Sequence, residues 1–233
     1  MQAQTVSYNF PIDNTVERKL RLIRRCLPAE SAIDYGGMWE VDGYYSNQSH
    51  DKLGVKHVTM VDIEKSENWI RNPSLREGID FREGDFSDSK FMRSIEFRYD
   101  LGIAFDVLLH QINLRETLSL MLSKVRKHFV VTTPVIPDGQ MPYRNSLVLL
   151  SGVRDDRLIP FREKWTEDAD YWSNFSDPTN VRWNHWLWGL SPSFLQSLMA
   201  GLGWDMIHKE IWRGWLPKDT LWRCGGFVFK RHA

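Results

Sequence analysis

The stretch that decides the fold is "AIDYGGMWEVDGYYS", residues 32–46, in which an apolar run ends in an acid and two glycines. A strand that leads into a glycine turn is typical of folds that bind a nucleotide at the end of their first strand. The usual dinucleotide motif is G-x-G-x-x-G, whose glycines let the backbone approach a pyrophosphate. Here Gly36 and Gly37 are followed at once by Met38 and Trp39, so the later glycine positions carry side chains. The turn therefore favours a ligand that has a carboxylate and lacks a pyrophosphate.

Strands and helices alternate around this turn. Asn14 and Glu17 form a capping-box pattern that opens a helix, which Pro28 ends. Leucines and methionines at helical spacing predict another helix over residues 114–125. Apolar runs predict five strands, in the order "SAIDYG", "HVTMVDI", "IDFREGD", "YDLGIAFDVLLH" and "KHFVVTTPV". Such alternation predicts βαβ units and a mainly parallel sheet, whose strands all end at the edge where ligands bind.

The last third of the chain differs from the first two. Residues 134–190 show no regular period, and we expect an inserted substrate cap there, because a structureless loop of that length is rare. Nine of the eleven tryptophans lie from Trp165 onward, and five of these fall within the cap, which is therefore aromatic. Ser191 and Pro192 then open a helix, and two strand-like segments close the chain as an antiparallel pair. We expect one α/β domain over 1–233, with a doubly wound, mainly parallel seven-stranded sheet and an antiparallel C-terminal hairpin.

Composition excludes several classes of protein. Thirty basic and thirty acidic residues cancel, so the chain lacks the overall basic charge typical of nucleic-acid binding. The two cysteines form no metal spacing and no disulfide framework, and we expect neither a metal nor a disulfide. No signal-peptide pattern and no membrane-spanning run is present, so we expect a cytoplasmic location and no membrane partner. The first helix has one basic face, which is either solvated or a patch for a substrate phosphate; it carries Arg18, Lys19, Arg21, Arg24 and Arg25.

Two further acids follow the second and third predicted strands. Asp62 ends "HVTMVDI", where an acid accepts hydrogen bonds from both hydroxyls of a ribose. Asp85 ends the third strand at the same edge, where it can accept a hydrogen bond from the amine of an adenine. Ribose and adenine without a pyrophosphate indicate S-adenosylmethionine as the cofactor.

Three motifs carry a family resemblance. Residues 37–39 and 42–46 match the string G-x-W-D-G-x-Y-S with two residues inserted, and residues 107–110, "VLLH", match V-L-Y-H. "WGLSPSFLQSLMAGLGW" is similar to a later helix motif of the same proteins. The chain thus resembles class I S-adenosylmethionine-dependent methyltransferases, and among them the tRNA wobble-uridine carboxymethyl-type branch. The resemblance covers about residues 14–133 and 188–233, and it implies the sheet and C-terminal hairpin predicted above.

The expected cofactor site gathers these residues at one edge of the sheet. Asp34 orders the glycine loop, and Gly36 and Gly37 let the backbone pass close to the methionine part of the cofactor. Trp39 either walls the site beside Tyr45 or packs in the core beneath the following helix. The full set of expected cofactor-binding residues is Asp34, Gly36, Gly37, Trp39, Tyr45, Asp62, Ile63, Asp85, Phe86 and Asp106.

The candidate catalytic residues are His110, Asp106 and His185. His110 lies beyond the fourth strand and is either a general base or a residue that holds the loop by a hydrogen bond. Asp106 lies between that strand and His110, and Gln111 follows. The aromatic cluster around His185 either stacks on a flat acceptor or packs the cap on the sheet; it contains Trp183, Trp186 and Trp188.

The expected function is methyl transfer to an oxygen or nitrogen atom of a small molecule such as a sugar, a nucleotide-sugar or a secondary metabolite. The balanced charge and the aromatic cap favour this reading. An RNA-base methyltransferase is the alternative enzyme, which the resembled branch and the basic first helix suggest. A non-catalytic binding module with the same fold is the third hypothesis.

Overall fold

A twisted sheet crosses the whole molecule in the computed structural model, which describes residues 14–38, 41–140, 147–149, 188–214 and 222–232. Seven longer strands follow one another in the order β3-β2-β1-β4-β5-β9-β8. The five strands β1 to β5 run parallel, and β9 lies antiparallel between β5 and β8. This is the mainly parallel, doubly wound sheet with an antiparallel C-terminal hairpin that the sequence predicts.

Each predicted strand is present within a few residues of its expected place. The strands are β1 (Ser31–Tyr35), β2 (His57–Asp62), β3 (Ile79–Glu83), β4 (Tyr99–Phe105), β5 (Val125–Val135), β6 (Leu147–Leu149), β7 (Trp188–Leu190), β8 (Trp204–Trp212) and β9 (Arg223–Arg231). The helices are α1 (Thr15–Arg24), α2 (Tyr44–Asp51), α3 (Glu67–Arg71), α4 (Ser89–Ser94), α5 (Leu114–Ser123) and α9 (Pro192–Gly201). Single 3₁₀ turns are η1 (Pro73–Arg76), η2 (Leu108–His110) and η3 (Asp138–Gln140).

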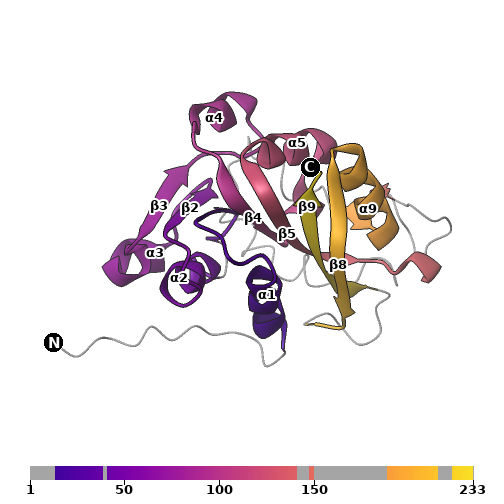
Figure 1. The fold of residues 1–233 in the computed structure, drawn as a ribbon, viewed down its shortest axis with the longest axis horizontal. Helices are drawn as coiled ribbons and strands as arrows, with labels where there is room; N and C mark the ends of the chain where they lie inside the picture. The colour runs from indigo at the N-terminus through magenta and orange to yellow at the C-terminus, as the bar shows by residue number, and fades with distance from the viewer. Residues whose placement is uncertain (1–13, 39–40, 141–146, 150–187, 215–221, 233) are drawn as a thin grey trace.

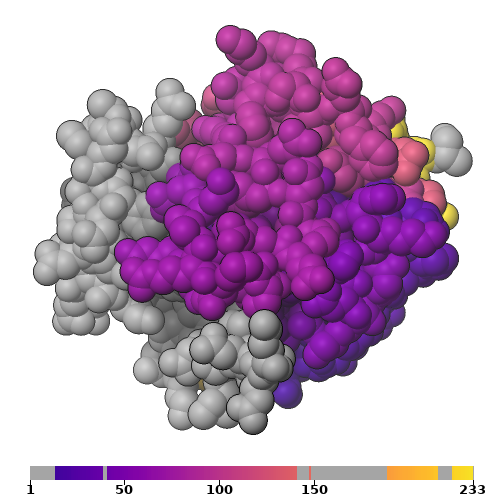
Figure 2. Space-filling model, turned by 90° about the vertical axis from the view of Figure 1, so that its left-hand side faces the viewer, coloured from indigo at the N-terminus to yellow at the C-terminus, as the bar shows by residue number. Residues whose placement is uncertain are grey.

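Helices cover both faces of the sheet, as Figure 1 shows. On one face α4, α5 and α9 enclose the largest apolar cluster, which includes Met92, Leu118 and Met199. On the other face α1 and α2 enclose a second cluster, which includes Leu22 and Tyr45. Figure 2 shows the β3 end of the molecule, where segments from the first half of the chain form the surface. Since β1, β2, β4 and β5 are covered on both sides, successive residues of these strands are buried, except near the starts of β2 and β5.

Two short strands lie within the stretch where the sequence predicts an inserted cap. β7 adds to the end of β5 through a pairing between Val135 and Leu190, and β6 pairs with β7 in the antiparallel sense. The sheet therefore has nine strands in the described residues, two more than expected. Residues 141–146 and 150–187, with most of the predicted cap, lie outside the described residues, so the cap stays a prediction.

Two local expectations for α1 are wrong. Asn14 precedes the helix, but its side chain makes no capping hydrogen bond, because its backbone (φ −69°, ψ 13°) is not in the extended form usual for a cap. Lys19 belongs to the basic face that the sequence predicts to be either solvated or a patch for a substrate phosphate, whereas it is only 8% exposed. By contrast, the Ser191 hydroxyl accepts the Phe194 N–H and caps α9 as predicted.

Cys26 and Cys224 are both buried, and no disulfide joins them. Within the described ranges, no helix has the length and apolar character needed to cross a membrane.

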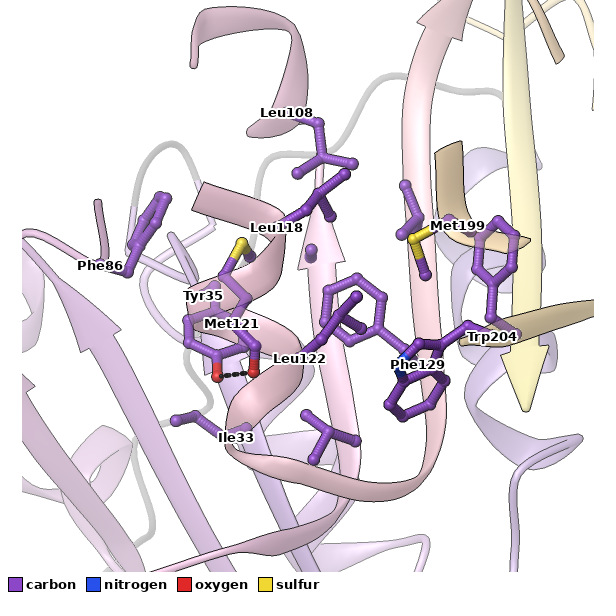
Figure 3. Packing of buried hydrophobic residues seen from close by; sticks show 14 of the residues in the cluster. Ile33, Tyr35, Phe86, Leu108, Leu118, Met121, Leu122, Phe129, Met199 and Trp204 are labelled. Carbon is purple, nitrogen blue, oxygen red and sulfur yellow. Dashed lines mark hydrogen bonds between the residues drawn. The ribbon is translucent and has the colours of Figure 1, made fainter. Parts of the chain in front are cut away.

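Tyr35 joins the sheet to a covering helix. Its hydroxyl lies fully buried at the end of β1 and donates to the Met121 carbonyl of α5 at 2.9 Å (Figure 3). We expect Tyr35→Phe to lower the free energy of unfolding by about 0.5–1.5 kcal/mol, because one buried hydrogen bond is lost while the ring stays packed. Urea unfolding of the two proteins measures this difference, and equal stability would mean that the bond contributes nothing.

Candidate functional site

The carboxyl ends of β1, β2, β3 and β4 lie side by side at one edge of the sheet, because these strands are parallel neighbours. After β1 the chain crosses to β2, while β4 lies on the other side of β1. In open α/β sheets, ligands bind at such a switch in strand order. The predicted anchors Asp34, Asp62, Asp85 and Asp106 all lie at or beyond these four strand ends.

The glycine loop folds tightly over the end of β1. Gly36 has a positive φ of 73° and donates its N–H to the Val61 carbonyl of β2 at 2.8 Å. A Cβ atom on Gly37 would lie 2.5 Å from an oxygen of Asp34 and 2.9 Å from the Met60 sulfur. Any side chain at position 37 would therefore push the loop away from the two strands. The pair of glycines is needed for this close approach.

Asp34 is a buried acid beneath the loop. It is 2% exposed and accepts a hydrogen bond from the Ser46 hydroxyl at 2.8 Å. Burial raises the pKa of Asp34 to about 7, and the Asp62 carboxylate adds to the rise, while Ser46 and Lys19 oppose it. The carboxyl thus ties the end of β1 to the first turn of α2 through Ser46, across the glycine loop that lies between them.

Asp62 binds the glycine loop directly. One carboxylate oxygen accepts the Met38 N–H at 2.9 Å, and the other accepts the Ile63 N–H at 2.8 Å. Burial raises the pKa of Asp62 to about 6, although both backbone hydrogen bonds lower it. Each carboxylate oxygen has a further lone pair, so the group can still accept hydrogen bonds from a ligand. Asp62 therefore shapes the loop as well as offering acceptors at the strand end, a second role that sequence reasoning missed.

Asp85 lies near Asp62 on the chain segment that follows β3. The Gly84 N–H donates to the Asp62 carbonyl at 2.8 Å, and Asp85 accepts the Ser87 N–H at 2.7 Å. The next residue, Phe86, packs edge-on against Tyr35 with ring centroids 5.8 Å apart. Asp85 is half-buried and lines a cavity of about 320 Å³.

That cavity also contains the leading base candidate. His110 ends the 3₁₀ turn after β4 and lines the same cavity as Asp85, together with Gln111 and Glu116. The carbonyl of Gln111 accepts the Trp188 indole N–H at 2.7 Å, so one tryptophan of the predicted acceptor cluster lies against this turn. Glu116 is a carboxylate that sequence reasoning did not single out.

Asp106 forms an ion pair that the sequence did not predict. Lys19 of α1 approaches one Asp106 oxygen at 2.7 Å, and the Thr132 hydroxyl lies 3.3 Å from the other. The Lys19 ammonium also lies over the rings of Tyr45 and Phe105, 5.3 Å from each centroid. Burial works to lower the pKa of Lys19, but the Asp106 carboxylate and Tyr45 together raise it above its ordinary value.

A signal for Lys19 was present in the sequence. Val16, Leu20 and Ile23 define the apolar stripe of α1, and Lys19 occupies the i+3 position of the same stripe. A charged residue at a stripe position indicates a buried ion pair. Tyr45, predicted to wall the site, is buried beneath this pair and packs edge-on against Phe105. Two predicted site residues, Trp39 and His185, lie outside the described residues, as do Trp183 and Trp186.

No metal centre is evident in the part of the chain that the structure describes. Within those residues, no group of three or more histidine, cysteine, aspartate or glutamate side chains is arranged to hold an ion.

Comparison with known proteins gives a likeness of fold. No protein-family model and no curated protein matches the sequence. Many solved structures are similar to the chain, and three of them illustrate the likeness. An O-methyltransferase family protein from Burkholderia thailandensis has 14% identity and a TM-score of 0.57, over 93% of this chain and 56% of its own. The N-methyltransferase NodS from Bradyrhizobium japonicum, in complex with S-adenosylhomocysteine, has 13% identity and a TM-score of 0.52, over 93% and 86%.

The third structure is the cyclase SpnF, with 11% identity and a TM-score of 0.65 over 98% of this chain and 86% of its own. At these identities the likenesses establish the fold alone, which is the Rossmann-like methyltransferase fold. The chain spans 56% of the length of the Burkholderia protein. Since a cyclase has a similar structure, the reaction must be argued from the site.

The close approach at Gly37 gives a steric prediction. We expect Gly37→Ala to lower the free energy of unfolding by about 1–3 kcal/mol, because the added methyl group meets Asp34 and Met60. Gly201→Ala is the matched control, since no atom lies within 4 Å of a Cβ at that exposed helix end. Urea unfolding compares the two variants, and equal effects would exclude a special constraint at the loop.

The pKa of Asp34 gives a prediction on pH. Between its ordinary value of 3.8 and about 7, the folded protein holds a proton that the unfolded chain has lost. The contribution of Asp34 to stability is therefore largest below about pH 4 and is lost as the pH rises through 7. We expect Asp34→Asn to reduce the loss of stability between pH 5 and pH 8 by about 2 kcal/mol. Urea unfolding at both pH values tests this, and parallel losses in the two proteins would contradict it.

Proposed function

We propose that this chain is an S-adenosylmethionine-dependent methyltransferase that acts on an oxygen or nitrogen atom of a small molecule. One observation carries the proposal. The tight loop at Gly36 and Gly37, the Asp62 carboxylate that binds it, and the Asp85 carboxylate beyond β3 all lie at one edge of the sheet. In the strand order β1, β2, β3 they would meet the methionine part, the ribose and the adenine of an adenosyl ligand, and the two carboxylates would accept hydrogen bonds from it.

The chemistry of the residues fits this cofactor. S-adenosylmethionine carries a sulfonium, an ammonium, two ribose hydroxyls and an adenine amine, which are cations or hydrogen-bond donors, and one carboxylate, whose charge the ammonium balances. The strand ends offer four carboxyl groups, at Asp34, Asp62, Asp85 and Asp106, and burial raises the pKa of two of them. A cation nearby would favour the ionised form of both and offset the cost of their burial. A pyrophosphate would meet the same carboxylates with like charge.

The residues would divide the cofactor between them. Asp62 and the neighbouring Ile63 would hold the ribose, Asp85 and Phe86 the adenine, and the glycine loop with Asp106 the methionine part. When bound, the cofactor supplies the methyl group and a good leaving group. The protein then contributes mainly orientation, which is worth about 7–11 kcal/mol of the barrier in well-aligned reactions. His110 would take a proton only from an acceptor that must lose one, such as an alcohol.

Two features of the chain bear on the class of methyl acceptor. The chain has no net charge, and Trp188 lies against the turn that carries His110. Both features favour a small molecule over a nucleic acid. The resemblance to the tRNA wobble-uridine branch suggests an RNA base as the alternative acceptor. Our proposal also includes the predicted aromatic cap and a cytoplasmic location. RNA as the acceptor requires tRNA binding that weakens steeply with salt.

Binding of S-adenosylhomocysteine tests the proposal. We expect the protein to bind it in isothermal titration calorimetry. We expect Asp85→Asn to weaken binding about tenfold, because an amide has one accepting oxygen where a carboxylate has two, and its NH₂ group cannot accept from the adenine amine. An asparagine can still accept the Ser87 N–H, so folding is kept. Asp80→Asn is the control, since Asp80 lies exposed on β3, the strand that precedes Asp85, and accepts a hydrogen bond from Arg82.

Two outcomes would contradict parts of the proposal. A folded protein that binds no S-adenosylhomocysteine would favour the non-catalytic module. Equal affinity in Asp85→Asn and the unmodified protein would show that Asp85 does not bind the adenine.

A further inference from the structure

Lys19 and Asp106 form a nearly buried ion pair whose two members face in different directions. The side chain of Lys19 is 10% exposed and that of Asp106 is 31% exposed. The ammonium is covered by the rings of Tyr45 and Phe105, while the carboxylate is the part of the pair that solvent or a ligand can reach. Any ligand at the end of β4 would therefore meet Asp106 first.

Stability alone does not account for this pair. Taking two charges out of water costs about as much as their attraction returns, so an apolar pair of similar volume is often as stable. Removing one member is costly, since it leaves the other charge buried without a partner. A carboxylate held in place at the end of a strand is what the pair provides beyond stability.

The backbone at Asp106 supports a functional role. Its φ of 59° lies in the left-handed region, which asparagine and aspartate tolerate better than most residues. The Asp106 N–H donates to the Thr132 carbonyl at 2.7 Å, and Lys19 and Thr132 engage the side chain. An unusual conformation that several contacts maintain is characteristic of ligand sites. Here the contacts hold the carboxylate in place just beyond the end of β4.

The strand order indicates which part of the cofactor would lie there. The sheet runs β3, β2, β1, β4, with the proposed adenine acceptor after β3 and the proposed ribose acceptor at the end of β2. A ligand laid across these ends in that order would bring its methionine part over β1 and β4. The charge of Lys19 also lowers the pKa of Asp34, which packs against Gly37 of the glycine loop. The ion pair is therefore close to that loop.

We propose that Lys19 is a positioning residue of the cofactor site: its ammonium holds the Asp106 carboxylate, which accepts a hydrogen bond from the ammonium group at the methionine end of S-adenosylmethionine. This inference rests on the cofactor assignment under "Proposed function". Lys19 itself touches no part of the cofactor. Its role is to keep a carboxylate in a fixed place beside the glycine loop.

Two probes separate this role from a structural one. S-adenosylhomocysteine has the ammonium group, whereas 5′-methylthioadenosine keeps the adenosine and sulfur and lacks the amino-acid part. The variants are Lys19→Met, Asp106→Asn and the double variant, in which no buried charge is left unpaired. Asparagine keeps the backbone conformation at position 106. Arg18→Met is the control, because Arg18 lies on the same helix as Lys19 but forms its ion pair with Glu210 of β8.

We expect calorimetry to give at least a tenfold loss of S-adenosylhomocysteine affinity in all three variants, with 5′-methylthioadenosine affinity within twofold of the unmodified protein. Thermal unfolding should show a lower Tm in Lys19→Met and partial recovery in the double variant, without recovery of binding. Arg18→Met should bind both probes normally.

Three results would overturn the inference. The double variant could bind S-adenosylhomocysteine as well as the unmodified protein does, or both probes could lose affinity equally. Arg18→Met could also weaken S-adenosylhomocysteine binding as much as Lys19→Met does. Failure of the unmodified protein to bind either probe would instead overturn the cofactor assignment itself, so the two failures can be told apart.

Discussion

The hydrogen bond from the Met38 N–H to the Asp62 carboxylate is the constraint on which the site depends. It joins the glycine loop after β1 to the end of β2. With Gly37 packed on Asp34 and Met60, it leaves the loop almost no freedom. A buried carboxylate is an expensive group to use as a structural tie. Its retention is understandable if a ligand with hydroxyl donors and a positive charge meets the same acid.

The site is built from acids in different environments. Asp34 is buried with one hydrogen bond from a side chain, and Asp62 receives two from the backbone. Asp85 is half-buried in a cavity, and Asp106 has a lysine as its partner. Because these environments differ, Asp62, Asp85 and Asp106 can each make a different contact with one extended ligand, while the buried Asp34 supports the loop from beneath. The carboxylate with a charged partner is also the one farthest along the sheet from the proposed adenine end.

Local sequence patterns predicted most of the fold. Short runs of apolar residues identified β1, β2, β4 and β5, since strands covered on both faces are buried along most of their length. Capping by Ser191 was also correct, because a helix start is set by a few adjacent residues. Capping by Asn14 was wrong, because its backbone is not in the extended form that a capping side chain needs. β6 and β7 are three residues each, too short to leave a periodic signal.

The sequence by itself determined which acids lie at the strand ends, because a parallel sheet brings the carboxyl end of every strand to one edge. The tertiary structure alone decided what each acid contacts. Lys19 and Asp106 are 87 residues apart, and they meet because the rotation of α1 on the sheet buries that one lysine among five basic residues. No local pattern fixes that rotation, since it depends on how the whole helix packs against β5, β9 and α2.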